Sequence, residues 1–259
     1  TAAGIAVTGM AWRPGEAEAA AMPKKWNETF DVVVVGSGFA GLAAAYEAKK
    51  AGASVVVLEK MRTPGGNSII NGGVVSAAGS PLEARDGIKD SPELLLKDML
   101  AAGLNLNHLE LARLVAYESN NTVQWTINEL GVKYKDSLSQ EGGHSVPRMY
   151  STYNQSGSAI VTQQLEKLKE IGVVPRTQVL LKRLLRDTDG RVKGVEIREK
   201  YVFPKENSGA TKFIKAKKAV VLATGGFGND IAFRTIQDPR LTAGLESTNH
   251  PGATGEALR

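Results

Sequence analysis

Near the start of the chain, apolar residues form two short continuous runs with a helical segment between them. Residues 30–35 read FDVVVV and residues 53–58 read ASVVVL, and such β-branched runs are typical of strands buried on both faces. The alanine-rich residues 42–50 predict a helix, and Gly52 follows it where a left-handed residue commonly ends a helix. Together the three segments predict a βαβ unit of roughly 30 residues.

The middle of the chain changes to helical periodicity, with apolar residues spaced three and four apart. The predicted helices extend over residues 91–103, residues 108–130 (as one or two helices) and residues 159–171. Ser91 fits the N-cap and Pro92 the first helical position of the first of these helices. Residues 63–80 and 139–158 are rich in glycine and polar residues, and we expect them to be loops.

Towards the end of the chain, the pattern becomes strand-like. Residues 178–186 and 191–198 alternate in polarity around Asp189-Gly190, which predicts a β-hairpin. Residues 218–223 read KAVVLA and predict a further buried strand. The whole pattern predicts an α/β fold, a Rossmann-like domain with an added antiparallel hairpin.

Composition excludes several classes of site. The 259 residues include no cysteine, which excludes disulfides, thiolate zinc sites, iron–sulfur clusters and covalently attached c-type haem. Only three histidines are present, so we expect no metal site. The formal charge is +5, but no basic block is interleaved with aromatic residues, and we expect no nucleic-acid binding. No apolar run approaches the ~20 residues that span a bilayer, so we expect no membrane span.

Residues 1–21 resemble the second half of an export signal. A mildly apolar stretch is followed by small residues with A-x-A spacing at Ala17-Glu18-Ala19, which is typical of a cleavage site. The alternative is an ordinary alanine-rich N-terminal arm. The first interpretation predicts a signal remnant over residues 1–21 and a periplasmic protein.

The clearest chemical motif is Gly36-x-Gly38-x-x-Gly41, which lies between the first predicted strand and helix. In this context the first glycine permits a tight turn, the second lets the backbone approach a pyrophosphate, and the third allows close packing of helix and strand. The helix N-terminus then offers free N–H groups to the phosphates. Glu59 ends the second strand, where a carboxylate accepts hydrogen bonds from ribose hydroxyls and disfavours a 2′-phosphate.

Two further glycine-rich segments favour FAD over NAD. Residues 63–68 (TPGGNS) follow the ribose-binding strand, and residues 224–226 (TGG) follow the last predicted strand. An extended FAD needs such additional backbone approaches, whereas a nicotinamide domain usually continues with more βα units. The predicted cofactor is therefore FAD.

The combined motifs resemble a known family. The stretches that carry the likeness are ETFDVVVVGSGFAGLAAA, LEK, GGNSIINGGVVSAAG, GGHSVPR, VVLATGGFGND and NHPGATGEAL. They are very similar to the flavoprotein of soluble fumarate reductases and flavocytochromes c, within the superfamily of the succinate dehydrogenase flavoprotein. The resemblance implies that residues 22–259 form a Rossmann-like FAD-binding domain, the N-terminal portion of a larger flavoprotein, and that a mobile capping domain is largely absent from this chain.

The resemblance also assigns cofactor-contacting positions. By this likeness the pyrophosphate loop is Gly36, Ser37, Gly38, Ala40 and Gly41; the ribose end is Glu59 with Lys60; the flavin edge is Gly66, Asn67, Ser68, Gly72 and Gly73; the adenine-side backbone is Val179; and the remaining turns are Ala223, Thr224, Gly225, Thr254 and Gly255. Respiratory members carry a histidine tethered to the flavin where this chain has Asn67, so we expect non-covalent FAD.

The catalytic groups of the family follow the segment that ends this chain, so the catalytic residues stay unknown. Gly72 and Val74 also depart from the residues usual at their positions, alanine and glycine. On the substrate side, His144 and Arg148 in GGHSVPR are candidates, because a guanidinium offers a bidentate fork to a carboxylate. The alternative, equally weighted, is a structural loop whose histidine caps a carbonyl.

The resemblance implies a reductase that transfers hydride from reduced FAD to the double bond of an unsaturated carboxylate, of the fumarate, methacrylate, acrylate or urocanate type. It implies three partners: that small substrate, the rest of the flavoprotein, and a separate cytochrome c or other electron donor. The alternatives are an oxidative flavoenzyme of the aspartate oxidase or ketosteroid dehydrogenase type, a non-catalytic flavin electron-transfer module, and an NAD-dependent dehydrogenase.

Overall fold

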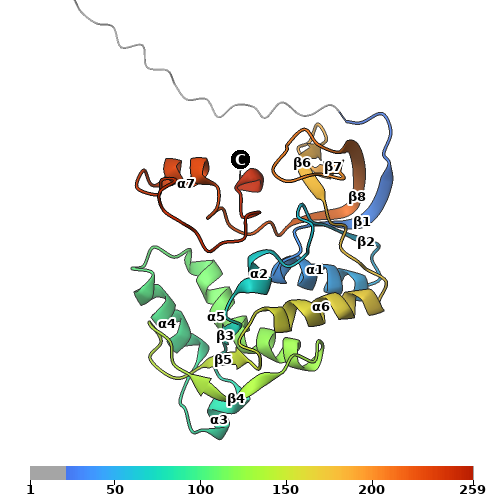
Figure 1. Ribbon diagram of the computed structural model, residues 1–259. Coiled ribbons are helices and arrows are strands. Elements are labelled where there is room, and N and C mark those ends of the chain that lie inside the picture. The colour runs from blue at the N-terminus through green and yellow to red at the C-terminus, as the bar shows by residue number, and fades with distance from the viewer. Residues whose placement is uncertain (1–21, 259) are drawn as a thin grey trace, which may run out of the picture.

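The computed structural model describes residues 22–258, and it begins with the expected βαβ unit (Figure 1). Strand β1 (Glu28–Val35), helix α1 (Phe39–Lys50) and strand β2 (Val55–Leu58) follow one another. β1 and β2 pair in parallel, with Val32 opposite Val55 and Val35 opposite Leu58. The predicted unit is therefore confirmed. The predicted export signal lies outside the described residues.

The main sheet has five strands in the order β2-β1-β8-β7-β6. Strands β6 (Val179–Arg186) and β7 (Val192–Glu199) form the predicted hairpin, and β8 (Ala210–Leu222) runs antiparallel to β7 and parallel to β1. β8 is longer than the predicted strand at residues 218–223. Its first half alternates buried Ile214 and Ala216 with lysines, so no continuous apolar run marks it. The α/β class with an added antiparallel hairpin is confirmed.

A smaller three-stranded antiparallel sheet forms the other end of the molecule, in the order β3-β5-β4 (Figure 1). Its strands are β3 (Val74–Ser76), β4 (Tyr134–Ser139) and β5 (Met149–Thr152), and helices α2 (Gly66–Ile70) and α3 (Pro81–Arg85) lie nearby in the chain. Most of these elements fall in the expected loops 63–80 and 139–158, and that expectation was wrong. They are too short to show a periodic pattern, and tertiary pairing holds them.

The longer helices agree with the sequence pattern. They are α4 (Pro92–Ala102), α5 (Leu109–Asn128) and α6 (Ser158–Glu170), followed by the short α7 (Ile231–Gln237) and a 3₁₀ turn (Glu256–Leu258). The side chain of Ser91 accepts the N–H of Leu94 at 3.2 Å, as expected of an N-cap. Residues 109–128 form one continuous helix. No helix among residues 22–258 is both long enough and apolar enough to cross a bilayer.

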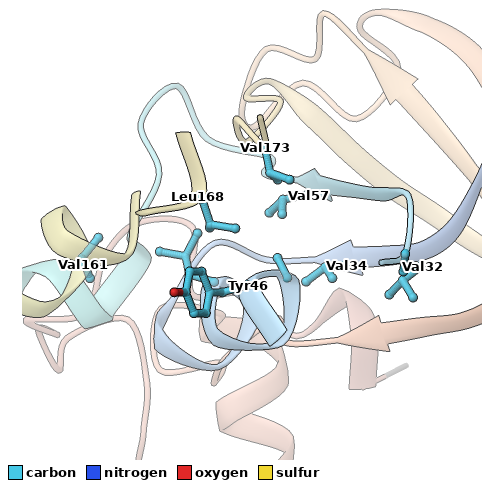
Figure 2. Close-up of a cluster of buried hydrophobic side chains, with 10 residues drawn as sticks. Val32, Val34, Tyr46, Val57, Val161, Leu168 and Val173 are labelled. Carbon is cyan, nitrogen blue, oxygen red and sulfur yellow. The ribbon is translucent and has the colours of Figure 1, made fainter. Parts of the chain in front are cut away.

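Both faces of β1 are buried, as its β-branched run predicts. On one face, Val32 and Val34 pack with Val57 against side chains of α1 and α6, including Tyr46 and Leu168 (Figure 2). On the opposite face, side chains of β1 and β2 cluster with side chains of β7 and β8. This cluster includes Val33, Val35, Val56, Leu58, Val195, Ile197 and Ile214. β1 ends at Val35, and the candidate site begins at that end.

Candidate functional site

The carboxyl ends of three parallel strands meet at one edge of the main sheet. Gly36 follows β1, and its N–H donates to the carbonyl of Leu58 at the end of β2, at 2.8 Å. The N–H of Ala223, which follows β8, donates to the carbonyl of Val35 at 2.8 Å. The loop after β1 therefore lies between the ends of β2 and β8. In open α/β sheets this is the edge where ligands bind.

Two glycines of the loop, Gly36 and Gly41, are required by close backbone contacts. Gly36 has a φ of +102°, and a Cβ there would lie 2.2 Å from the carbonyl oxygen of Ala223. A Cβ on Gly41 would lie 2.0 Å from the carbonyl oxygen of Gly36, and one on Gly38 would lie 2.9 Å from Ser68 Oγ. The tight turn and the close helix–strand packing that the motif predicts are therefore present.

The N-terminus of α1 is directed at this loop. Leu42 is the first residue of the helix whose N–H bonds back by one turn, to the carbonyl of Gly38 at 3.0 Å. One earlier amide, that of Phe39, is bound by Ser68 Oγ at 3.0 Å. N-cap Gly38 provides no side-chain cap, and Ala40 in the first turn is exposed. The free amides and the helix dipole favour an anionic group such as a pyrophosphate here.

Glu59 is buried at the end of β2 and is held in a fixed orientation. Its Oε2 accepts the hydroxyl of Ser37 at 2.5 Å and the N–H of Ser37 at 3.2 Å, while its Oε1 accepts the N–H of Met61 at 2.8 Å. Ser37 Oγ also accepts the N–H of Gly65 at 3.0 Å. Val179, the predicted adenine-side position, donates its N–H to the carbonyl of Glu59 at 2.8 Å. The carboxylate therefore lies beside the glycine loop, as a ribose acceptor must.

Several glycines in the predicted flavin-side segments face open space. No atom lies within 4 Å of a Cβ built on Gly66, Gly72 or Gly225, although Gly66 and Gly225 have positive φ values of +49° and +72°. Gly72 has neither a close neighbour nor a left-handed backbone, so nothing in the chain itself requires glycine there. The backbone at all three positions is therefore open to the approach of a planar group. Together with the glycine loop and Glu59, this cradle fits FAD.

The remaining predicted positions take part in contacts within the chain. Gly73 has a φ of +66°, and a Cβ built on it would lie 2.2 Å from Thr152 Oγ1. Thr254 contacts Lys60, and the N–H of Gly255 donates to Asp230 Oδ2 at 3.1 Å. Both polar atoms of the Asn67 amide are engaged by the C-terminal segment. Asn249 and Asp230 lie in two of the stretches that carry the family resemblance, but sequence reasoning assigned neither a role, because their partners Asn67 and Gly255 are distant in the sequence.

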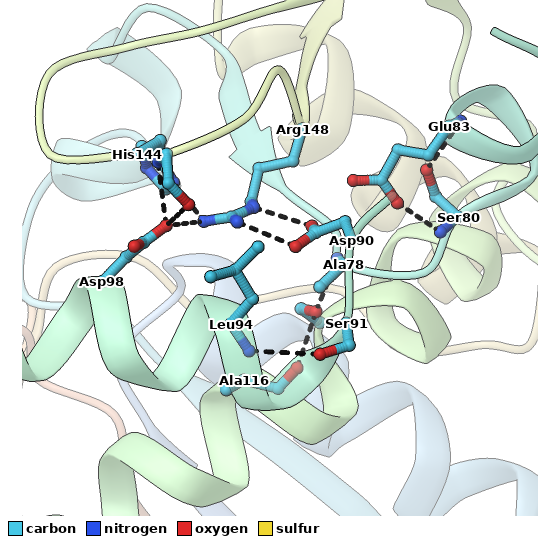
Figure 3. A network of polar contacts seen from close by, with 12 residues as sticks. Ala78, Ser80, Glu83, Asp90, Ser91, Leu94, Asp98, Ala116, His144 and Arg148 are labelled. Atoms are coloured by element: carbon cyan, nitrogen blue, oxygen red, sulfur yellow. Dashed lines mark hydrogen bonds and ion pairs between the residues drawn. The ribbon is translucent and has the colours of Figure 1, made fainter. Parts of the chain in front are cut away.

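His144 and Arg148 lie just before β5 of the smaller sheet, in a largely buried polar network (Figure 3). The Arg148 side chain is fully buried, and its guanidinium forms a fork with Asp90 at 2.8 Å to each oxygen and an ion pair with Asp98 at 2.6 Å. His144 Nδ1 lies 3.0 Å from Arg148 Nη1 and must accept, because a guanidinium has only donors. The prediction that Arg148 presents its guanidinium to a substrate is therefore wrong. The guanidinium already binds Asp90 and Asp98, and the side chain is not exposed.

Glu83 adds a third carboxyl to this network and makes it sensitive to pH. Burial, together with the neighbouring Asp90 carboxylate, raises the pKa of Glu83 from 4.5 to about 7, although Ser80 donates its N–H to the carboxyl at 2.6 Å. The folded protein therefore holds a proton that the unfolded chain releases. The contribution of Glu83 to stability is fully present below pH 4.5 and is lost as the pH rises through 7, by at most about 3 kcal/mol.

Glu83→Gln tests this dependence. The glutamine keeps an oxygen for the N–H of Ser80 but cannot ionise, so we expect the variant to lose the fall in unfolding free energy between pH 5 and pH 8. Urea denaturation at several pH values measures it, with exposed Glu118→Gln as the control. A variant whose stability still declines with the wild-type slope would show that another group causes the dependence.

Comparison with known proteins places this geometry among flavoproteins. A family model described as the FAD binding domain matches residues 31–259. The acrylate reductase flavoprotein subunit of Shewanella woodyi is 43% identical over 235 residues, which are 90% of this chain and 46% of that protein. The chain thus spans less than half the length of that relative.

Solved structures agree with the sequence comparison. The open conformation of a flavocytochrome c3 fumarate reductase superimposes with a TM-score of 0.82 at 32% identity, covering 90% of this chain and 40% of that one. The 3-ketosteroid-Δ4-(5α)-dehydrogenase from Rhodococcus jostii RHA1, in complex with 4-androstene-3,17-dione, gives a TM-score of 0.79 at 26% identity, covering 93% of this chain and 55% of that one.

Proposed function

Because the chain belongs to the FAD binding domain family, we propose that it is the FAD-holding part of a reductase that saturates the double bond of a small unsaturated carboxylate. The predicted FAD cofactor and Rossmann-like FAD-binding fold are confirmed by the family match and the fold. The observation that carries the reaction class is the 43% identity to a flavoprotein subunit named as an acrylate reductase, over 90% of this chain. Non-covalent attachment stays a prediction, supported by an asparagine at position 67.

In this proposal the residues of the chain bind and orient the cofactor. The N-terminus of α1 and the backbone of Gly38 face the pyrophosphate, and Glu59 accepts the ribose hydroxyls. Gly66, Gly72 and Gly225 leave space for the flavin. FAD, when bound, supplies the hydride for the β-carbon of the substrate. The proton for the α-carbon comes from a group outside the described residues.

The partners follow from the same proposal. The acrylate reductase subunit and the flavocytochrome c3 are more than twice as long as the region they share with this chain. We infer that further polypeptide covers the flavin and binds the substrate carboxylate. The Shewanella woodyi relative is named as a subunit, which supports a separate electron donor such as a cytochrome c. The export-like pattern at residues 1–21 supports a periplasmic location.

Anaerobic dye oxidation tests the proposed reaction. Protein purified from its natural source is mixed with reduced viologen, and acrylate, methacrylate, fumarate and urocanate are added in turn. We expect one of them to oxidise the dye, and acrylamide, which lacks the carboxylate, to react far more slowly. Protein that carries FAD but reduces none of these acids would contradict the proposal.

A second candidate function rests on the likeness to the Rhodococcus jostii dehydrogenase. An oxidative enzyme of that type would take two hydrogens from the saturated 5α-counterpart of 4-androstene-3,17-dione, reducing its flavin and forming the Δ4 double bond, and would release the electrons rapidly to oxygen. The two candidates are distinguished by which compound bleaches the oxidised flavin and which reoxidises the reduced flavin. The higher identity to a named reductase, 43% against 26%, favours the first.

A further inference from the structure

The segment after β8 returns across the carboxyl edge of the main sheet, and residues 249–256 of it are here named the strap. In Figure 1 the end of the chain lies beside the carboxyl edge of β1 and β8. We propose that Asn67 is a positioning residue: it fastens the strap, and it shapes the flavin site through the strap rather than by contact of its own amide with the cofactor. This inference rests on the proposed FAD site.

Asn67 connects α2 to the beginning of the strap. Its Nδ2 donates to Asn249 Oδ1 at 2.6 Å, and its Oδ1 accepts the N–H of His250 at 2.6 Å. The two partners lie 182 and 183 residues further along the chain. The side chain that the family resemblance places along the flavin edge is thus occupied on both polar atoms by another part of the protein.

The chemistry of these contacts explains why the residue is an asparagine. The strap presents one acceptor, Asn249 Oδ1, next to one donor, the N–H of His250, and an amide offers the complementary pair on adjacent atoms. The N–H of His250 can only donate, so it fixes the position of Asn67 Oδ1 and leaves Asn67 Nδ2 to donate to Asn249 Oδ1. An aspartate at position 67 would keep the contact with His250 and place a carboxylate oxygen against Asn249 Oδ1.

The far end of the strap is held at the end of β2. Lys60 Nζ lies 3.0 Å from both carboxylate oxygens of Glu256 and also contacts the hydroxyl of Thr254. Its middle packs onto the loop after β2, because a Cβ on Gly252 would lie 2.8 Å from Met61 Cγ. The strap therefore joins the ribose end of the site to the flavin end.

A third set of contacts ties the strap to the loop after β8. The N–H of Asn229 donates to the carbonyl of Ala253 at 3.0 Å, and its Nδ2 donates to the carbonyl of Asn249 at 2.9 Å. Ala253 itself is buried. With Asn67 and Lys60 fixed, the ends of β2, α2 and β8 are held at set distances from one another, and those three segments carry the open glycines and Glu59.

A double-mutant cycle on FAD affinity distinguishes positioning from direct contact. We expect Asn67→Ala and Asn249→Ala each to raise the FAD dissociation constant by about tenfold. Because both substitutions break the same fastening, the FAD dissociation constant of the double variant should be at most about twice that of the weaker-binding single variant. A direct contact between Asn67 and the flavin predicts instead that the two losses multiply. Exposed Asn121→Ala on α5 is the matched control.

Hydrogen exchange provides a readout that does not depend on FAD. The amide of His250 should exchange faster in Asn67→Ala and stay protected in Asn67→Asp, whose carboxylate still accepts it. Multiplying losses in the cycle, or unchanged exchange at His250 in Asn67→Ala, would overturn the inference. A wild-type protein that binds no FAD would contradict the proposed function instead, while exchange at His250 still tests the fastening.

Discussion

Gly41→Ala is expected to destabilise the protein by about 1–3 kcal/mol and to leave it without FAD. The added methyl carbon would lie 2.0 Å from the carbonyl oxygen of Gly36 and 3.3 Å from Ala223 Cβ. The nearest of these atoms is backbone and cannot rotate away, so α1 must move off β1. That movement displaces the helix N-terminus that faces the pyrophosphate. Urea denaturation and the flavin content of the purified variant measure the two losses.

Gly142→Ala is the control for this prediction. Gly142 lies in the exposed loop after β4, outside the left-handed region, with no atom within 4 Å of its Cβ position. It should unfold and bind FAD like the wild-type protein. A Gly41→Ala protein of wild-type stability that retains its FAD would show that the close packing of helix and strand is not needed.

Arg148→Met is expected to destabilise the protein by about 3–5 kcal/mol, although the residue takes no part in the cofactor site. Methionine fills much of the space but leaves the Asp90 side chain, which is fully buried, and the mostly buried Asp98 without their cation. Uncompensated buried charge accounts for most of the expected loss. The free energy of unfolding, measured in urea at pH 7, tests the expectation.

The matched control is Arg85→Met. Arg85 also pairs with two aspartates, Asp86 and Asp136, but it lies on the surface, where such pairs contribute about 0–1 kcal/mol. If both variants lose the same small amount, burial is not what makes the Arg148 network important. FAD affinity corrected for the unfolded fraction should be unchanged in both.

The βαβ unit could be predicted from sequence because its signals are local. The runs at β1 and β2 are β-branched and buried on both faces, and the glycine spacing between them is dictated by contacts such as that of Gly41 with Gly36. The strands of the smaller sheet could not be predicted. β3 has three residues and β5 has four, and their partners come from distant parts of the chain.

The same division applies to the candidate site. The positions of Gly36, Gly38, Gly41 and Glu59 could be predicted because they belong to one βαβ motif, at the ends of β1 and β2. The surroundings of Arg148 could not, since its partners Asp90 and Asp98 lie 58 and 50 residues away in the sequence and carry no motif. From sequence, a histidine and an arginine in a polar loop are equally consistent with a substrate fork and a structural ion pair. Only the fold shows the buried partners.

FAD binding by two glycine variants with equal backbone strain tests the central claim most directly. Gly225 and Gly190 have φ values of +72° and +77°, and neither has an atom within 4 Å of its Cβ position. Alanine at either position should therefore lower stability by a similar amount, about 1 kcal/mol. Only Gly225 lies at the proposed cradle, because Gly190 is in the turn between β6 and β7. We predict at least tenfold weaker FAD binding for Gly225→Ala and wild-type binding for Gly190→Ala; equal affinities would contradict the assignment of the carboxyl edge as the flavin site.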